Sequence, residues 1–294
     1  KRIILIYLLL SVLSSTIIFI VFRLYKKYEV NTLQAIVINY FIACTVGFFG
    51  FIEGSDFTAV PSEKWFPGAL MLGVLFITVF NLAAITTQKS GLSVVAVATK
   101  MSVAIPVFCG IFLYNESTGV LKIAGILLAL VAVYLTSIKT KDGISIKWQN
   151  LIFPLLVFLG SGIIDTSLKF LETSYVSKTD VGLFSSTIFA TAGLLGVLVM
   201  IYQAIRGELK LQFKNLLGGI ALGVPNYFSI YFLVLALRSE GYESSTIFTI
   251  NHVSIVALST IVGIVLFKEK LIRKNWIGLI LAMISIILVA NSAI

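Results

Sequence analysis

The sequence predicts an all-α integral membrane protein, with ten transmembrane helices arranged as two inverted five-helix repeats. Three observations lead to this prediction: an apolar composition, ten apolar runs of membrane-spanning length, and a repeat within the chain. Of the 294 residues, 59% are hydrophobic and only 12% are charged. Soluble domains carry about a quarter of their residues as charged groups, so much of this surface must face lipid.

The ten apolar runs follow one another with short connections. They cover residues 3–22, 32–52, 67–87, 92–114, 120–138, 150–171, 180–205, 215–237, 244–267 and 274–293. A helix needs about 20 apolar residues to cross a hydrocarbon layer roughly 30 Å thick. Because lipid offers the backbone no hydrogen-bond partner, each run is expected to be a helix. Strands of a membrane barrel would be about ten residues long and would alternate polar with apolar side chains.

A repeat relates the end of the fourth run to the end of the ninth. The segment Leu113–Glu116 is followed by Gly125, and the segment Leu266–Glu269 is followed by Gly278 at the same spacing. The offset is 153 residues in both blocks. Both glutamates lie at helix junctions, where each is expected to cap the following helix. The glycines begin small-xxx-small pairs, which favour close helix packing.

A weaker match at an offset of 146 residues pairs Ser15–Leu24 with Ser161–Phe170. Because each repeat holds five helices, an odd number, two copies joined directly must cross the bilayer in opposite senses. Inverted repeats are typical of secondary transporters, which bind substrate between the halves near the midplane. We therefore predict a first repeat, a linker and a second repeat over residues 1–138, 139–149 and 150–294.

Ionisable residues inside the predicted helices are the best candidates for a functional site. Their burial costs several kcal/mol unless they face a cavity or a partner. Lys100, Asp165 and His252 lie within the fourth, sixth and ninth helices, and Lys169 lies near the end of the sixth, where it could reach the interface. Asn251 and His252 follow Lys100 at offsets of 151 and 152 residues, close to its repeat-related position.

Each candidate has a structural alternative. Lys100 lies about eight residues, or roughly 12 Å, into its helix, so it either faces a cavity or forms a structural ion pair. His252 is either a substrate ligand or a satisfied core histidine. Asp165 and Lys169 are one helical turn apart and could neutralise each other. Otherwise Asp165 is a protonatable carboxylate that couples transport to a proton gradient.

Uncharged residues are expected to complete the substrate pocket. Each could hydrogen-bond to a polar solute or to a neighbouring helix. They are Asn39, Tyr40, Asn81, Asn226, Tyr227 and Tyr231.

The charge balance and the scarcity of ligands argue against other classes of protein. The formal net charge is +9, but the basic residues lie between apolar runs, where they set topology rather than bind nucleic acid. Cys44 and Cys109 are expected to be buried thiols, and with one histidine they offer no clustered metal site. No Walker-type motif occurs, and one deep aspartate is too few for an aspartyl protease. We expect no enzymatic activity, metal or cofactor.

The duplicated ten-helix architecture resembles the drug/metabolite transporter superfamily, and its EamA-type members in particular. The resemblance is carried by an apolar fourth helix that ends in a glutamate, a short turn, and a glycine-bearing fifth helix. This pattern occurs as Pro106 to Glu116 with Gly125, and again as Ile255 to Glu269 with Gly278. It implies a transporter with a central cavity lined by helices 1, 3, 4, 6, 8 and 9 or a similar set. It implies no particular substrate.

The interior charges favour an anionic or zwitterionic solute. The first helix has no acidic residue, whereas small multidrug exporters of the superfamily carry a cation-binding glutamate there. We expect a secondary active transporter of an amino acid or organic acid in the cytoplasmic (inner) membrane, with possible proton coupling. A monomer is compatible with this function. The alternatives are a multidrug or lipophilic solute exporter, a lipid scramblase and an intramembrane enzyme.

The basic residues predict an orientation. Six Lys and Arg residues fall on the side of the membrane that carries both termini, and fourteen fall on the opposite side. The positive-inside rule then places both termini outside and the central linker in the cytoplasm. The resemblance implies the reverse, because EamA-type members generally keep both termini in the cytoplasm.

Overall fold

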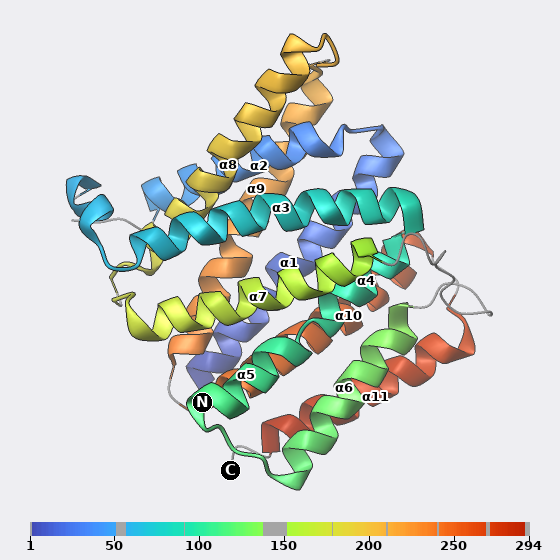
Figure 1. The fold of residues 1–294 in the computed structure, drawn as a ribbon. Coiled ribbons are helices and arrows are strands. Elements are labelled where there is room, and N and C mark those ends of the chain that lie inside the picture. Colours follow the sequence, from blue (N-terminus) through green and yellow to red (C-terminus); the bar gives the residue numbers. More distant parts are fainter. Residues whose placement is uncertain are drawn as a thin grey trace. The chain divides into compact units, whose positions relative to one another are not determined.

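The computed structural model describes residues 2–50, 57–90, 92–137, 152–177, 179–209, 211–239, 241–268 and 271–291. Within these ranges the chain is helical and contains no strand (Figure 1). The predicted linker over 139–149 and the glutamate at 269 lie outside the described residues.

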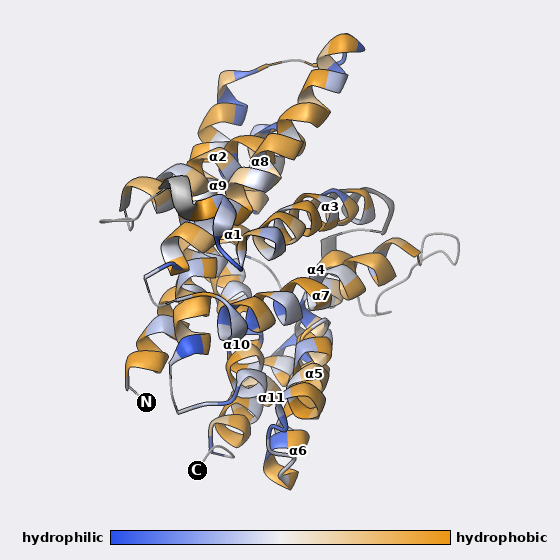
Figure 2. Cartoon of the chain, turned by 60° about the vertical axis from the view of Figure 1, so that its left-hand side comes forward, coloured by the Kyte–Doolittle hydropathy of each residue, from blue (hydrophilic) through white to orange (hydrophobic). Residues whose placement is uncertain are grey.

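The helices match the ten predicted runs. They are α1 (Arg2–Tyr28), α2 (Thr32–Gly50), α3 (Phe66–Ser90), α4 (Leu92–Met101), α5 (Ala104–Tyr114), α6 (Val120–Ser137), α7 (Ile152–Ser174), α8 (Val181–Ile205), α9 (Phe213–Arg238), α10 (Ser244–Phe267) and α11 (Arg273–Asn291), with a 3₁₀ turn η1 (Phe57–Ser62) before α3. Among the described residues, eight helices are long and apolar enough to cross a membrane. Hydrophobic residues cover most of their length (Figure 2). This confirms the predicted all-α membrane fold.

The fourth predicted span is divided into α4 and α5 because of Pro106. Proline has no N–H, and its ring clashes with the carbonyl four residues earlier, which here belongs to Ser102. The Ser102 carbonyl accepts instead from the N–H of Ile105, at 2.9 Å. The Ser102 hydroxyl donates to the carbonyl of Thr99, at 2.6 Å. The helix therefore changes course between Met101 and Ala104.

The described helices form two compact units. The first contains Lys1–Val12, Val79–Thr166 and Ser239–Ile294, and the second contains Leu13–Thr78 and Ser167–Arg238. Each unit takes helices from both predicted repeats. The repeat boundaries at 138 and 150 concern the order of helices along the chain and stay a prediction.

In the first unit α6 packs against α11, its repeat-related helix (Figure 1). A Cβ on Gly125, early in α6, would meet Val289, late in α11. The Asn275 amide, early in α11, donates to the carbonyl of Leu135, late in α6, at 2.9 Å. The two helices are therefore antiparallel, as inverted repeats require.

The second unit shows the same relation between α2 and α8, the second helices of the two repeats. A Cβ on Gly196, late in α8, would lie 2.6 Å from Val37, early in α2. Gly47, late in α2, lies against Ser186, early in α8. Equivalent helices thus run antiparallel in both units, which confirms the inversion.

Helix ends also repeat at the predicted offset of 153 residues. α5 ends at Asn115 and α10 ends at Lys268, both in the left-handed conformation with φ of 50° and 52°. Their N–H groups donate to the carbonyls of Gly110 and Gly263. These caps satisfy carbonyls that the last helical turn leaves open. The backbone thus repeats where the sequence matched.

Candidate functional site

Lys100, Asp165 and His252 come together in the first compact unit. They lie on α4, α7 and α10, respectively. The Nε2 atom of His252 is 3.3 Å from the Oδ2 atom of Asp165, and the Asp165 carboxylate attracts the Lys100 ammonium electrostatically. Lys100 and His252 are buried, and the Asp165 side chain is 14% exposed. Three ionisable groups from three membrane helices thus form one cluster.

A close approach of α7 to α5 helps to place Asp165. Gly162 lies one helical turn before Asp165 on α7. A Cβ at this position would lie 2.6 Å from the Cβ of Ile105, in the first turn of α5. Glycine therefore allows α7 to lie directly against the point where α5 begins. Lys100 lies just before the same interruption, in the last turn of α4.

The middle of α10 contributes two buried polar atoms without a hydrogen-bond partner in the described part of the chain. They are the Asn251 Oδ1 and the His252 Nδ1. Nearly all buried polar groups in proteins have a partner, and in a polar site that partner is often a water or a bound solute. These atoms can therefore hydrogen-bond to a ligand beside Asp165. Asn81, on the part of α3 within the same unit, is half-buried.

The predicted pocket residues Asn39 and Asn226 belong to the second unit and bond to each other. The Asn226 Nδ2 donates to the Asn39 Oδ1 at 3.0 Å, and the Asn39 Nδ2 donates to the Ile36 carbonyl at 3.2 Å. Asn215 and Gln34 are joined in the same way, at 2.6 Å. For these amides the structure favours the cross-helix alternative, in which they hold α2 against α9. A role in substrate binding stays a prediction.

The three predicted tyrosines lie in an aromatic cluster of the second unit. Tyr40 stacks on Phe189 with ring centroids 6.2 Å apart, and Tyr227 stacks on Tyr231 at 5.5 Å. Tyr40 and Tyr227 are fully buried, whereas Tyr231 is half-buried. Their burial gives them a packing role, and substrate contact stays a prediction.

Lys169 lies in a different charge cluster from Asp165. Its ammonium pairs with the Glu172 carboxylate at 3.1 Å and donates to the Leu237 carbonyl at 3.2 Å. Arg238 also pairs with Glu172, at 3.6 Å. Within the second unit this cluster satisfies carbonyls at the end of α9. A role of Lys169 in coupling stays a prediction.

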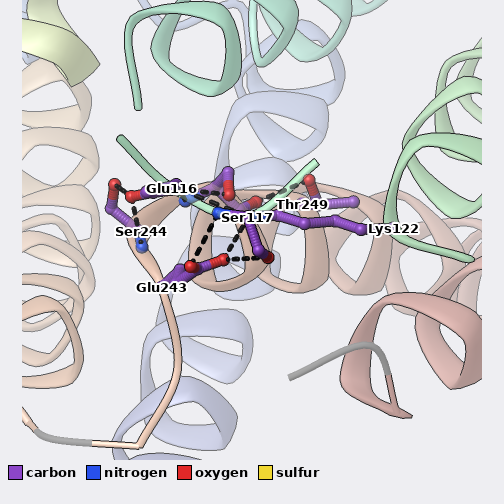
Figure 3. A network of polar contacts seen from close by, with 7 residues as sticks. Glu116, Ser117, Lys122, Glu243, Ser244 and Thr249 are labelled. Atoms are coloured by element: carbon purple, nitrogen blue, oxygen red, sulfur yellow. Dashed lines mark hydrogen bonds and ion pairs between the residues drawn. The ribbon is translucent and has the colours of Figure 1, made fainter. Parts of the chain in front are cut away.

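A second polar network of the first unit surrounds the start of α10 (Figure 3). The Glu116 carboxylate accepts from the N–H groups of Ser244 and Ser245, at 2.9 and 3.1 Å, and from both hydroxyls. Lys122 is fully buried and pairs with Glu116, at 3.5 Å, and with Glu243. Glu116 is therefore a helix cap. The prediction that it caps the following helix, α6, is wrong, because its carboxylate caps α10 instead.

Glu243 precedes α10 and lies outside the membrane-spanning segments. Its carboxylate accepts from the backbone N–H and the hydroxyl of Ser117, both at 2.8 Å. Burial alone would raise the pKa of Glu243, but the hydrogen bonds from Lys122 and Ser117 and the Lys122 charge hold it below its usual value. The sequence analysis missed Lys122 and Glu243 because both lie near helix ends, where charged residues are common. The serine pair that opens α10 was the available signal.

The described residues contain no group of three or more His, Cys, Asp or Glu side chains that could hold a metal ion. Cys44 and Cys109 are free thiols. Both are only half-buried, which corrects the prediction that they are buried.

Residues 2–138 match the EamA-like transporter family. The chain is 27% identical over 284 residues to an uncharacterized protein of Haemophilus influenzae, and this match covers 95% of each chain. It also shares its fold with a crystal structure that is 12% identical, with a TM-score of 0.81 over 100% of this chain and 98% of the other. The family match confirms the resemblance found in the sequence. Over residues 2–138 the chain is similar to the EamA-like transporter family, and its apolar helices are those of a multi-pass membrane protein.

Proposed function

We propose that this chain is a secondary active transporter of a small anionic or zwitterionic metabolite, such as an amino acid or organic acid, in the cytoplasmic membrane. Lys100, Asn251 and His252 are its substrate ligands, and Asp165 couples transport to a proton gradient. One observation carries the proposal: Lys100, Asp165 and His252 come together from three helices, and the His252 Nδ1 and Asn251 Oδ1 are buried without a hydrogen-bond partner in the described residues.

The energetic cost of these charges supports a functional role. A Lys or Asp at the centre of a membrane helix costs about 2.5–3.5 kcal/mol on insertion scales. Replacing a buried ion pair with apolar side chains is often neutral or stabilising, so Lys100 and Asp165 are poor choices for stability alone. Their presence in the span is better explained by the binding of a polar solute.

The donor and acceptor types match a substrate that carries a carboxylate. The Lys100 ammonium offers three donors and no acceptor, so it suits a carboxylate group. The Asn251 Oδ1 is an acceptor and suits an ammonium or hydroxyl group of the same solute. Asp165 lies beside Lys100 and His252, so it can take part in coupling through its contact with these two partners.

The test is uptake of radiolabelled amino acids and organic acids by proteoliposomes under an imposed pH gradient. We expect Asp165→Asn to abolish gradient-driven accumulation of organic acids while their exchange remains, because exchange needs no net proton movement. Lys100→Met should abolish both activities. Cys109→Ala is the matched control, since it changes a neutral side chain on α5 in the same unit.

The alternative functions give different outcomes in these vesicles. Uptake of lipophilic cations instead of carboxylates would indicate a multidrug exporter. Lipid flipping without solute uptake would indicate a scramblase. Either result, or unchanged pH dependence in Asp165→Asn, would refute the proposal.

A further inference from the structure

We infer that His252 carries the coupling proton, taking it up at Nδ1 when a carboxylate substrate binds and releasing it when the substrate leaves. This inference rests on the proposed function and names the group that holds the proton. Asp165 then orients the imidazole ring through its contact with Nε2 and does not itself become protonated.

The contact with Asp165 fixes which ring nitrogen carries hydrogen. An ionised carboxylate only accepts hydrogen bonds, so the contact of the His252 Nε2 with Asp165, at 3.3 Å, favours the form in which Nε2 carries the hydrogen. In a neutral imidazole the other nitrogen then holds a lone pair. That nitrogen, Nδ1, is buried and has no hydrogen-bond partner among the described residues. Neutral His252 therefore presents an acceptor to the candidate site.

A carboxylate substrate is incompatible with that acceptor. Its oxygens and the Nδ1 lone pair would face each other without a hydrogen between them. In the imidazolium form Nδ1 carries a hydrogen and can donate to the substrate. The binding step is then R–COO⁻ plus H⁺ from solvent plus neutral His252, which give R–COO⁻ hydrogen-bonded to the new Nδ1–H. On release this N–H bond breaks and the proton returns to solvent.

The charge balance of the cluster leads to the same conclusion. With His252 neutral, Lys100 and Asp165 cancel each other, and a bound monocarboxylate would leave one negative charge in the membrane core. Such a charge is expensive there, and one proton on His252 removes it. A zwitterion adds no net charge, and its ammonium can donate to the neutral Nδ1. A monocarboxylate is therefore carried with one proton, whereas a zwitterion needs none.

Few other ionisable groups act on His252. It is the only titratable residue of α10. Among the described residues, Asp165 of α7 is in contact with it, and Lys100 of α4 interacts with that carboxylate. The other helices packed against α10 carry their charged residues near helix ends: Lys122 of α6, and Arg273 and Lys274 of α11. Their remaining titratable side chains are Tyr134 of α6 and Cys109 and Tyr114 of α5.

His252 is also the only histidine in the chain, so ¹⁵N-histidine labelling gives NMR signals from this residue alone. The nitrogen shifts of the full chain in lipid nanodiscs distinguish the two neutral tautomers from the imidazolium. We expect the neutral protein to hold hydrogen on Nε2. Asp165→Asn should lower the fraction of neutral protein that holds hydrogen on Nε2, because an asparagine amide can offer a donor as well as an acceptor to the ring, whereas Cys109→Ala should leave that fraction unchanged.

Probe ligands complete the test. At fixed pH, acetate should raise the imidazolium fraction of His252, whereas sodium chloride and zwitterionic L-alanine should leave it unchanged. Hydrogen on Nδ1 in the neutral protein, or no response to acetate, would overturn the inference. If the inference is overturned but vesicles still accumulate carboxylates, the proposed function stands without this role of His252. If vesicles take up neither carboxylates nor zwitterions, the proposed function itself fails.

Discussion

Glu116 makes the most concentrated set of contacts in the first unit, and its removal is the sharpest test of the packing described above. Its carboxylate receives the first two N–H groups of α10, from Ser244 and Ser245, and one charge contact from Lys122. Replacing Glu116 with alanine removes all of these at once. No side chain of α10 itself caps its N-terminus, so nothing local takes over this role.

The expected magnitude follows from those contacts. Loss of a helix N-cap costs about 0.5–2 kcal/mol. Breaking a buried ion pair costs about 3–5 kcal/mol when one charge is left without a partner, but Lys122 keeps its pairing with Glu243. We therefore expect Glu116→Ala to lower the free energy of unfolding by about 2–4 kcal/mol, which is above the typical effect of a point mutation. Glu116→Gln, which keeps one acceptor, should cost less than half as much.

Thermal unfolding in detergent measures this loss. One kcal/mol moves the Tm of a chain of this size by roughly 2–4 °C, so Glu116→Ala should lower it by about 4–16 °C. The control is Glu208→Gln, which alters an exposed carboxylate outside the spans. Adding Lys122→Met to Glu116→Ala should cost less than the two changes summed, because each single change already removes the contact between Glu116 and Lys122. A Tm within the error of the control would refute the cap.

Three further predictions test other features. Because the pKa of Glu243 is held below its usual value, its stabilising contribution is present above pH about 4.5 and is lost as the pH falls below that. A plot of Tm against pH should show this loss, and Lys122→Met should make the plot less steep in that range. Gly162→Ala should lower the uptake rate by pushing α7 away from Ile105, and the added change Ile105→Gly, which removes the Cβ that the new side chain would meet, should restore it. If uptake is not restored, the contact between Gly162 and Ile105 does not position the site. A membrane-impermeant reagent on intact cells should label a cysteine in a C-terminal tag but not one at Lys141, since the basic residues place both termini outside.

The helices could be predicted from the sequence because lipid allows few alternatives for the backbone. Each predicted run has its helix, and the ends agree to within a few residues. The fourth run was predicted as one span, but the missing N–H of Pro106 changes the bonding of Ser102 and divides it. Whether a proline bends or divides a helix depends on what replaces the missing bond, and the local sequence does not contain that information.

The candidate site was only partly predictable, because periodicity identifies neighbours within a helix but not between helices. Asp165 was compared with Lys169, one turn away, yet the first interacts with His252 and the second with Glu172. Similarly, Glu116 was assigned to the next helix, although it caps α10. Burial cost singled out Lys100, Asp165 and His252 correctly as residues that need partners. Only the packing of α4, α7 and α10 shows that they are partners of one another.

The backbone follows the repeat, but the charged cluster does not. At the offset of 153 residues, Lys100 corresponds to Val253 and His252 corresponds to Thr99; at the offset of 146, Asp165 corresponds to Phe19. Duplicated helices that run antiparallel can exchange conformations as the transporter opens to either side, and this exchange needs only the shared backbone. Substrate binding needs a fixed arrangement of donors and acceptors, and two mirrored copies would place like charges together in the membrane core. One charged cluster within a pair of inverted repeats therefore suits the proposed function, in which a single solute is held in one orientation while the surrounding helices alternate.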